Sequence, residues 1–435
     1  MTVEFSFNGK KMTAGEGQSV AGALLACGQE ELSRSSKYRR PRGVYCAHGH
    51  CPNCLVRVDG VPHVRSCLVP AGPGMRVETE GSAGKRFDVY RSLGVIGKFF
   101  PVGFQYRWFK RQNAAWRLWE NQLRKLAAET EIPAPFDIPA GERLRADLLV
   151  VGAGPAGIAA AATAARSGLR VVLAGRRPRL GGSAAPAVAS ADLLQATEFV
   201  RSAENVTVVA PGTVVAGFGD QYVIDRGDRA LEVTATASVL ATGAYERAVA
   251  FPGNDRPGVL LTSGLHRLVC EDGVLTGARA VLVAEDDTAY RLAVDLQRAG
   301  LRIQAIVDSR PGPAVALPEG IEVLTGARVT GVRGRRRITG VAIGQRTIAC
   351  DVVGMSGGWQ RADELRYTVT SVGDAVVHGE RATRIDPAGW ENAPLPVLQG
   401  VGAVAGTMDA DAAFTEGSLA GAWAAAQHTG GGNHG

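Results

Sequence analysis

The sequence predicts an α/β protein built from several domains, and three observations carry that prediction. The chain has 435 residues, which corresponds to two to four domains at roughly 100–200 residues each. It contains 56 glycines, nearly twice the usual share of ~7%. Two segments, 145–176 and 277–308, each have the pattern of a strand, a helix and a second strand. With 46% hydrophobic residues and 21 prolines, the chain is neither disordered nor collagen-like.

Residues 1–80 predict a small, mostly β domain. VEFSFNG and KKMTAGEG form a hairpin that turns at Asn8-Gly9, and SVAGALLACG (19–28) is a helix. CLVRVDG and MRVET alternate apolar and polar residues and are rich in branched side chains, so they are strands. This plan of strands around one short helix is typical of a β-grasp fold.

Four of the seven cysteines are clustered, as Cys46-x4-Cys51-x2-Cys54-x12-Cys67. This is the ligand spacing of plant-type 2Fe-2S proteins, in which a tight loop supplies three thiolates and a later residue the fourth. The glycine in CAHGHC lets the backbone wrap the cluster and direct N–H groups at its sulfur atoms. Structural zinc is the main alternative, although zinc sites more often use two separate Cys-x2-Cys pairs. Unmetallated thiols are the remaining alternative.

The histidines near this cluster and the three remaining cysteines are interpreted as structural residues. With four cysteines present, His48, His50 and His63 are not needed as ligands and are predicted to be loop residues. Cys27, Cys270 and Cys350 are isolated in apolar runs, which predicts buried core thiols.

Residues 81–140 differ in character from what precedes them. Ten of the chain's 26 aromatic residues lie between Phe87 and Trp119, and Trp116, Trp119, Leu123 and Leu126 share one helical face. Residues 1–140 also carry 20 Lys and Arg against 12 Asp and Glu. A solvated face, a protein partner or an anionic cofactor would each explain this surplus. Nucleic acid is not expected, because no basic and aromatic recognition motif is present.

A dinucleotide turn follows the strand LLVV. Gly152-Ala153-Gly154-Pro155-Ala156-Gly157 has the G-x-G-x-x-G spacing and opens a helix. The first glycine makes the tight turn, the second lets the pyrophosphate approach the backbone, and the third lets the helix pack on the strand. The helix N-terminus then faces the phosphates. The glycines and Pro155 also argue against a membrane span here, and the first residues lack a signal-peptide pattern, so we predict a cytoplasmic protein without a membrane span.

The carboxylate that normally binds the ribose is missing. It should end the second strand, where the sequence instead has Gly175, Arg176 and Arg177. Three interpretations of this site are open. It binds FAD through other contacts, it binds NADP or another adenine nucleotide that the arginines attract, or its role is purely structural. The second strand-helix-strand unit continues from VLVA into EDDTAY without glycines, so we predict no ordinary NAD(P)H site there.

Several segments together resemble the α-type subunits of heteromeric sarcosine oxidase, opine oxidase, D-hydroxyproline dehydrogenase and hydrogen cyanide synthase. SRSSKYRRPRGVYCAHGHCPNCLVRVDGVPHVRSC (33–67) resembles their ferredoxin-like segment, and PVGFQYRWF (101–109) resembles an aromatic connector. VVGAGPAGIAAA, the segment from Ala241-Thr242-Gly243 through FPGNDRPGVL, MSGGW (355–359) and VGAVAGTMDADAAFTEGSLAG (401–421) complete the resemblance.

The resemblance implies a fold and a set of sites. The fold would be an N-terminal β-grasp, 2Fe-2S ferredoxin-like domain followed by two Rossmann-like dinucleotide-binding domains of the pyridine nucleotide-disulfide oxidoreductase type. The expected domains are 1–85 (cluster), 86–140 (connector), 141–250 and 351–435 (FAD-binding) and 251–350 (second Rossmann-like domain). Gly181-Gly182 would pack by the pyrophosphate, Ala241, Thr242 and Gly243 would lie near the nucleotide, and Gly406 would precede a helix directed at the flavin ring.

The resemblance also implies a function. The chain would relay electrons from a partner amine-oxidising flavin subunit, through flavin and the cluster, to an acceptor. FMN at a subunit interface and additional small subunits belong to the same expectation, as does inactivity toward amines without the partner. No catalytic residue is predicted. A stand-alone flavoprotein NAD(P)H:acceptor reductase and a non-catalytic scaffold with a structural nucleotide are the alternatives. The chain ends before the folate-binding domain of large sarcosine oxidase α chains, so folate-coupled chemistry is not expected.

Overall fold

The computed structural model describes residues 2–35, 40–80, 116–117, 120, 141–184, 189–334, 337–370, 376–377, 380–381 and 397–430. The chain divides into two compact units. Unit 1 combines 1–134 with 246–358, and unit 2 combines 135–245 with 359–435. Most of the predicted aromatic connector, including Trp119, Leu123 and Leu126, lies outside the described residues.

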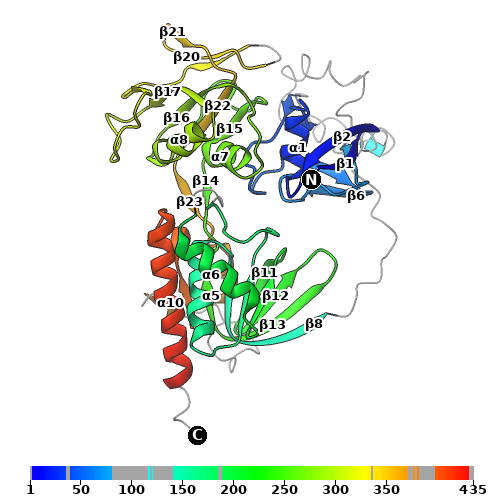
Figure 1. Cartoon of the computed structure of the whole chain (residues 1–435), viewed down its shortest axis with the longest axis vertical. Coiled ribbons are helices and arrows are strands. Elements are labelled where there is room, and N and C mark those ends of the chain that lie inside the picture. Colours follow the sequence, from blue (N-terminus) through cyan, green and yellow to red (C-terminus); the bar gives the residue numbers. More distant parts are fainter. Residues whose placement is uncertain are drawn as a thin grey trace. The chain divides into compact units, whose positions relative to one another are not determined.

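The N-terminal part of unit 1 is a five-stranded sheet in the order β2-β1-β7-β5-β6 with one helix against it (Figure 1). The strands are β1 (Thr2–Phe7), β2 (Lys10–Gly15), β5 (Leu55–Val58), β6 (Val61–Arg65) and β7 (Arg76–Thr79). A short hairpin, β3 (Ser33–Arg34) with β4 (Pro41–Arg42), precedes the cysteine loop. The predicted hairpin at Asn8-Gly9 is confirmed, with both residues at positive φ as a tight hairpin turn requires.

Helix α1 (Val20–Ala26) begins at Ser19, whose side chain accepts a hydrogen bond from the Gly22 N–H at 3.0 Å. Its buried face is Val20 to Leu24, which forms a core with Phe5, Phe7 and Val77. Cys27 caps the C-terminus of this helix and is exposed, its Sγ lying 3.6 Å from the Thr13 carbonyl. The prediction that Cys27 is a buried core thiol is therefore wrong, because the helix ends before the residue can turn inward; Cys350 is buried and Cys270 half-buried.

The second part of unit 1 is a parallel sheet in the order β15-β22-β16-β17-β18. Most residues of its strands are apolar, as expected for a parallel sheet whose strands are buried. The elements are β15 (Val259–Leu261), α7 (Thr262–Cys270), β16 (Arg279–Ala284), α8 (Thr288–Arg298), β17 (Arg302–Asp308), β18 (Glu322–Leu324) and β22 (Val352–Ser356). Three further strands, β19 (Gly331–Arg333), β20 (Gly340–Ile343) and β21 (Arg346–Ile348), form an antiparallel sheet.

Unit 2 is built on a larger, mostly parallel sheet in the order β10-β9-β8-β13-β26-β24-β25. In addition, β12 pairs with β13, and β11 pairs with β12. Its strands are β8 (Glu142–Val151), β9 (Val171–Ala174), β10 (Val206–Val209), β11 (Thr213–Phe218), β12 (Gln221–Asp225), β13 (Ala230–Leu240), β24 (Val376–Val377), β25 (Glu380–Arg381) and β26 (Val397–Gly400). Its helices are α5 (Pro155–Arg166), α6 (Ala191–Ser202), α9 (Glu364–Thr370), the 3₁₀ turn η4 (Gly402–Val404) and α10 (Ala410–Gly430). The strands β14 (Ala244–Glu246) and β23 (Trp359–Arg361) form a separate two-stranded sheet.

Helix α5 and the long helix α10 of unit 2 lie side by side (Figure 1), and two glycines of α10 let them approach closely. A Cβ added to Gly417 would lie 2.0 Å from the Ala156 carbonyl oxygen, and one added to Gly421 would lie 2.4 Å from that of Ala160. The alanine-rich sequence of α5 supplies the matching small side chains. The glycines at 417 and 421 thus let the end of the chain hold α5 against the sheet.

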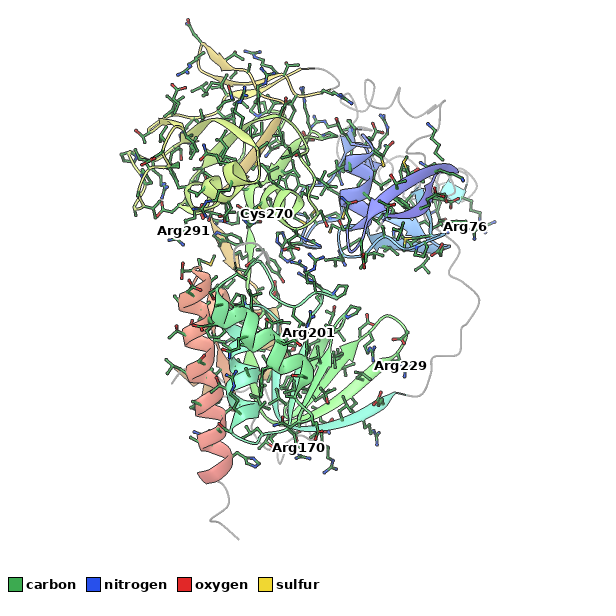
Figure 2. The ribbon with its side chains drawn as sticks, in the orientation of Figure 1. Arg76, Arg170, Arg201, Arg229, Cys270 and Arg291 are labelled. Atoms are coloured by element: carbon green, nitrogen blue, oxygen red, sulfur yellow. The ribbon has the colours of Figure 1, made fainter. Side chains whose placement is uncertain are left out.

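Figure 2 draws the side chains on both units, including Arg170 in unit 2, whose guanidinium pairs with Asp147 at 2.6 Å. Among the helices that the structure describes, none is long and apolar enough to cross a membrane.

Candidate iron–sulfur and flavin sites

The four predicted cluster ligands lie on the loops that flank β5 and β6. Cys46 and Cys51 follow β4, Cys54 directly precedes β5, and Cys67 lies two residues after β6. Cys46, Cys54 and Cys67 are only 1–2% exposed, and Cys51 is half-buried. The fold therefore brings together thiols that are 21 residues apart in sequence and shields most of them from water.

The thiols form two hydrogen-bonded pairs. The Cys51 thiol donates to Cys46, which lowers the pKa of Cys46 to about 5 and raises that of Cys51. Likewise the Cys67 thiol donates to Cys54, which lowers the pKa of Cys54 to about 7 and raises that of Cys67. Two thiolates on each of two irons is the ligand arrangement of a 2Fe-2S cluster, so the pairing fits that group. Among the described residues, no three or more His, Cys, Asp and Glu side chains are arranged to hold a single metal ion.

The backbone of the cysteine loop is shaped by two residues in the left-handed region. Ala47 has φ 50° and Gly49 has φ 75°, and the turn they make places the His50 N–H 3.3 Å from the Cys46 Sγ. An N–H directed at a ligand sulfur stabilises its negative charge. His48 Nδ1 lies 2.7 Å from the Cys46 carbonyl oxygen, and His63 pairs with Glu80 at 2.8 Å. His48 and His50 lie in the cysteine loop, as predicted. His63 lies within strand β6, so the prediction that it is a loop residue is wrong.

The site also includes residues that no motif predicted. The buried Ser66 hydroxyl donates to the Cys54 carbonyl at 2.7 Å, linking two ligand-bearing segments. The Arg267 side chain, from helix α7, donates to the Ala47 carbonyl inside the cysteine loop. Arg267 is 220 residues away from Ala47 in sequence and belongs to no recognised pattern, so only the structure could reveal it.

The predicted dinucleotide turn forms in unit 2 between β8 and α5. Gly152 has φ 114°, and a Cβ there would lie 2.1 Å from the Ala241 carbonyl oxygen. A Cβ on Gly157 would lie 1.8 Å from the Gly152 carbonyl oxygen. The first and third glycines are therefore required by packing. Gly154 differs, because a Cβ there would meet nothing closer than the Gly182 Cα at 3.9 Å, and this leaves open space beside the turn.

The N-terminus of α5 is suited to an anion. Gly154 is the N-cap and provides no side-chain hydrogen bond, Pro155 begins the helix, and no acidic residue lies in the first turn. The positive end of the helix dipole thus has neither a capping side chain nor an acidic residue of its own first turn to offset it. A pyrophosphate beside Gly154 fits this arrangement.

At position 175, where the ribose-binding carboxylate is missing, the structure leaves no room for a side chain. Strand β9 ends at Ala174, and a Cβ on Gly175 would lie 2.7 Å from the Ala153 Cβ. The position that carries the acid in other dinucleotide folds is thus closed to a side chain here. Arg176 is exposed, whereas the half-buried Arg177 donates through Nη1 to the Gly182 carbonyl at 2.6 Å.

The remaining predicted nucleotide residues gather around the same turn. Gly182 has φ 60°, and a Cβ there would lie 2.7 Å from the Gly154 Cα, so the 181–182 segment lies directly on the turn. The Ala241 N–H donates to the Val151 carbonyl at 2.8 Å, and Thr242 Oγ1 donates to the Ala362 carbonyl at 2.5 Å. Gly243 has φ 82° and open space where a side chain would be. Gly406, with φ 113°, is exposed and precedes α10 by four residues.

The corresponding turn in the second Rossmann-like sheet is occupied by the protein's own charges. Between β16 and α8 the chain reads Glu285, Asp286, Asp287. Arg310 pairs with Asp287 at 2.8 Å and with the fully buried Asp308 at the end of β17, also at 2.8 Å. Asp286 accepts from Thr288 and from the Ser356 hydroxyl. Three carboxylates at the place of a pyrophosphate would repel it, which supports the prediction of no ordinary NAD(P)H site.

Comparisons with known proteins match each of the two segments to a cofactor-binding family. Residues 1–82 match the family described as 2Fe-2S iron-sulfur cluster binding domain, and residues 147–230 match FAD dependent oxidoreductase. The chain is 32% identical to sarcosine oxidase subunit alpha of Rhizobium meliloti (strain 1021) over 93% of its own length and 44% of that protein. It is 41% identical to hydrogen cyanide synthase subunit HcnA of Pseudomonas aeruginosa over 19% of its own length and 74% of that protein.

Among solved structures, L-proline dehydrogenase from P. horikoshii has the same fold. It aligns with 99% of this chain and 74% of that chain, with a TM-score of 0.65 and 20% sequence identity. The chain spans less than half the length of the sarcosine oxidase alpha subunits it matches.

The fold and the two cofactor domains define an iron–sulfur flavoprotein of the oxidoreductase class, with 2Fe-2S and FAD as its cofactors. The predicted fold class is thereby confirmed. The chain belongs to the family of subunits that includes the sarcosine oxidase alpha subunit and hydrogen cyanide synthase subunit HcnA, as the sequence resemblance predicted.

Proposed function

We propose that this chain is the electron-transfer subunit of a heteromeric, flavin-dependent amine or amino-acid dehydrogenase or oxidase. A partner flavoprotein removes a hydride from a secondary amine or amino acid, and this chain passes the electrons through flavin and the 2Fe-2S cluster to an acceptor. One observation carries the proposal. A single chain combines a cluster domain with an FAD-type domain, and its relatives are named as subunits of sarcosine oxidase, opine oxidase and hydrogen cyanide synthase.

Under this proposal, the residues of the chain hold and tune the cofactors. Cys46 and Cys51 bind one iron, and Cys54 and Cys67 bind the other. The FAD pyrophosphate lies against Gly154 and the N-terminus of α5, with Gly152, Ala153, Pro155, Ala156 and Gly157 forming the turn. Gly182, Ala241, Thr242, Gly243 and Gly406 line the rest of the site, and Arg176 and Arg177 replace the absent carboxylate beside Gly175. The redox chemistry is supplied by the cofactors, while the protein sets their positions and potentials.

The second Rossmann-like sheet supports a relay over a stand-alone NAD(P)H reductase. A reductase would need an open phosphate-binding turn between β16 and α8, and here Asp286 and Asp287 stand at that turn with Arg310 paired to Asp287. Electrons would therefore enter from the partner subunit and its flavin, or from FMN at the interface between the subunits. The chain alone would be inactive toward amines.

The test is to purify the tagged chain from its native host and identify the flavoprotein that copurifies in stoichiometric amount. The complex and the isolated chain are then assayed with sarcosine, proline, hydroxyproline and an opine, with a dye as electron acceptor. The proposal predicts dye reduction by the complex with at least one of these donors and none by the isolated chain. Turnover of an amine or of NADH by the isolated chain would contradict it. A complex whose activity survives in the C54S variant would instead favour a scaffold role.

A further inference from the structure

Helix α7 of the second Rossmann-like sheet lies against the cysteine loop of unit 1. The Leu261 N–H, just before the helix, donates to the Tyr45 carbonyl at 3.0 Å. Gly264 approaches so closely that a Cβ there would lie 2.7 Å from the Cys46 carbonyl oxygen. The Cys46 side chain belongs to the same buried cluster as Val259 and Leu261. The first cluster ligand is therefore packed into a core that residues of this sheet provide.

One turn further along α7, Arg267 places a buried positive charge at the same loop. Its side chain is 8% exposed and donates to the carbonyl of Ala47, the left-handed residue that follows Cys46. Glu271, one turn further along, supplies a counter-charge: its carboxylate lies 3.3 Å from Arg267 Nε and its side chain is 3% exposed.

A second contact is made by Asp272, two residues beyond the end of α7, with the start of helix α1. Asp272 accepts hydrogen bonds from the Ser19 N–H at 3.0 Å and from the Ser19 hydroxyl at 2.7 Å. Gln18 donates to the Asp272 carbonyl at 2.8 Å. Two contacts thus join this segment to the cluster domain: Arg267 binds the cysteine loop, and Asp272, just past the helix, binds Ser19.

We infer that Arg267 is a positioning residue for the iron–sulfur cluster. Arg267 holds the Ala47 turn, and its positive charge raises the reduction potential of the cluster. Glu271 sets how much of that charge the cluster experiences. This rests on the proposed function, because it takes the four cysteines as cluster ligands. The second Rossmann-like sheet, whose phosphate turn is closed by Asp287 and Arg310, would then serve as the platform that tunes the cluster.

The sign of the effect follows from charge. One-electron reduction of a 2Fe-2S cluster adds one negative charge at the site, and a buried guanidinium stabilises that charge more than water would at a solvated surface. Removing the charge of Arg267 should lower the potential. Removing the charge of Glu271 should raise it, because Arg267 then acts without its counter-ion. A merely structural role for the pair would not move the potential in opposite directions.

The experiment is a potentiometric titration of the cluster in the full-length chain, followed by EPR of the reduced state. The variants are R267Q, R267K and E271Q, with S19A as the matched control that loosens the other contact without changing charge. At the wild-type midpoint, R267Q should show an about tenfold lower ratio of reduced to oxidised cluster, which is about 59 mV for a one-electron couple. E271Q should shift the ratio upward, R267K should restore most of the wild-type value, and S19A should leave it unchanged.

The outcomes distinguish a failure of the inferred role of Arg267 from a failure of the proposed function. Iron content near two per chain with unchanged potentials in R267Q and E271Q would overturn the inference and leave the proposed function intact. A wild-type chain that binds no iron would overturn both. If R267Q loses its iron through misfolding, E271Q decides: an upward shift supports the inference, and no shift or a downward one contradicts it.

Discussion

The two glycines at the start of α5 should respond differently to the same substitution. In G157A the added Cβ would lie 1.8 Å from the Gly152 carbonyl oxygen, whereas an ordinary contact begins at 3.4 Å. Both groups belong to the backbone, so the helix and the turn must separate. Overpacking of this kind costs about 1–3 kcal/mol. In a unit of this size each kcal/mol lowers the Tm by about 2–4 °C. G157A should therefore lower the Tm of the flavin-free protein and reduce its flavin content.

The matched substitution G154A adds the same methyl group where it meets no atom closer than 3.9 Å. The backbone at Gly154, with φ −86° and ψ −175°, is one that alanine adopts freely. Because alanine has less conformational freedom than glycine in the unfolded chain, the substitution stabilises the folded variant by about 0.4–1 kcal/mol. Alanine is a poorer N-cap than glycine, which offsets that gain. The Tm should be nearly unchanged, while the methyl group at the proposed pyrophosphate position weakens FAD binding at least about tenfold, or ~1.4 kcal/mol.

The assay combines thermal unfolding of the flavin-free variants with fluorescence titration of FAD. If G157A is as stable as the wild type, the packing argument is wrong. If G154A binds FAD with wild-type affinity, the assignment of the phosphate position is wrong, whatever the Tm values show.

Two further predictions concern unit 1. The C54S variant should lose most of its iron, because Cys54 is a buried member of a thiol pair. The C27S variant should keep two irons per chain, because Cys27 is an exposed helix cap. Equal iron contents in the two variants, measured by elemental analysis, would refute the ligand assignment. Burial raises the pKa of Glu246 from 4.5 to about 7. Between these values the unfolded state releases a proton that the folded state retains, so stability falls as pH rises through this window and then levels off. Relative to wild type, E246Q should thus gain about 1–3 kcal/mol between pH 4.5 and pH 8, measured by denaturant unfolding; a gain in the opposite direction would contradict the burial argument.

The sequence was informative wherever chemistry depends on local spacing. The Cys46–Cys67 pattern and the 152–157 turn are short motifs whose geometry is dictated by neighbouring residues, and the structure places both as expected. The two strand-helix-strand units could be recognised because buried parallel strands are continuous apolar runs. The predicted domain boundaries and the roles of individual nucleotide residues stay predictions.

What the sequence could not supply depends on contacts between distant segments. Arg267 acts on a loop 220 residues away, and the closure of position 175 is decided by the Ala153 side chain of another turn. Cys27 was misplaced for a related reason, since an apolar run does not reveal which residue lies at the helix end. Tertiary packing, which has no periodic signature, decides each of these cases.

The central claim is that electrons reach the cluster of this chain through a partner that oxidises an amine. The most direct measurement mixes the anaerobic complex with an amine donor and follows the visible absorption and EPR of the cluster. The account predicts cluster reduction in the complex and none when the isolated chain receives the same amine. Reduction of the cluster by the amine in the isolated chain, or a complex that turns over while its cluster stays oxidised under anaerobic conditions, would contradict it.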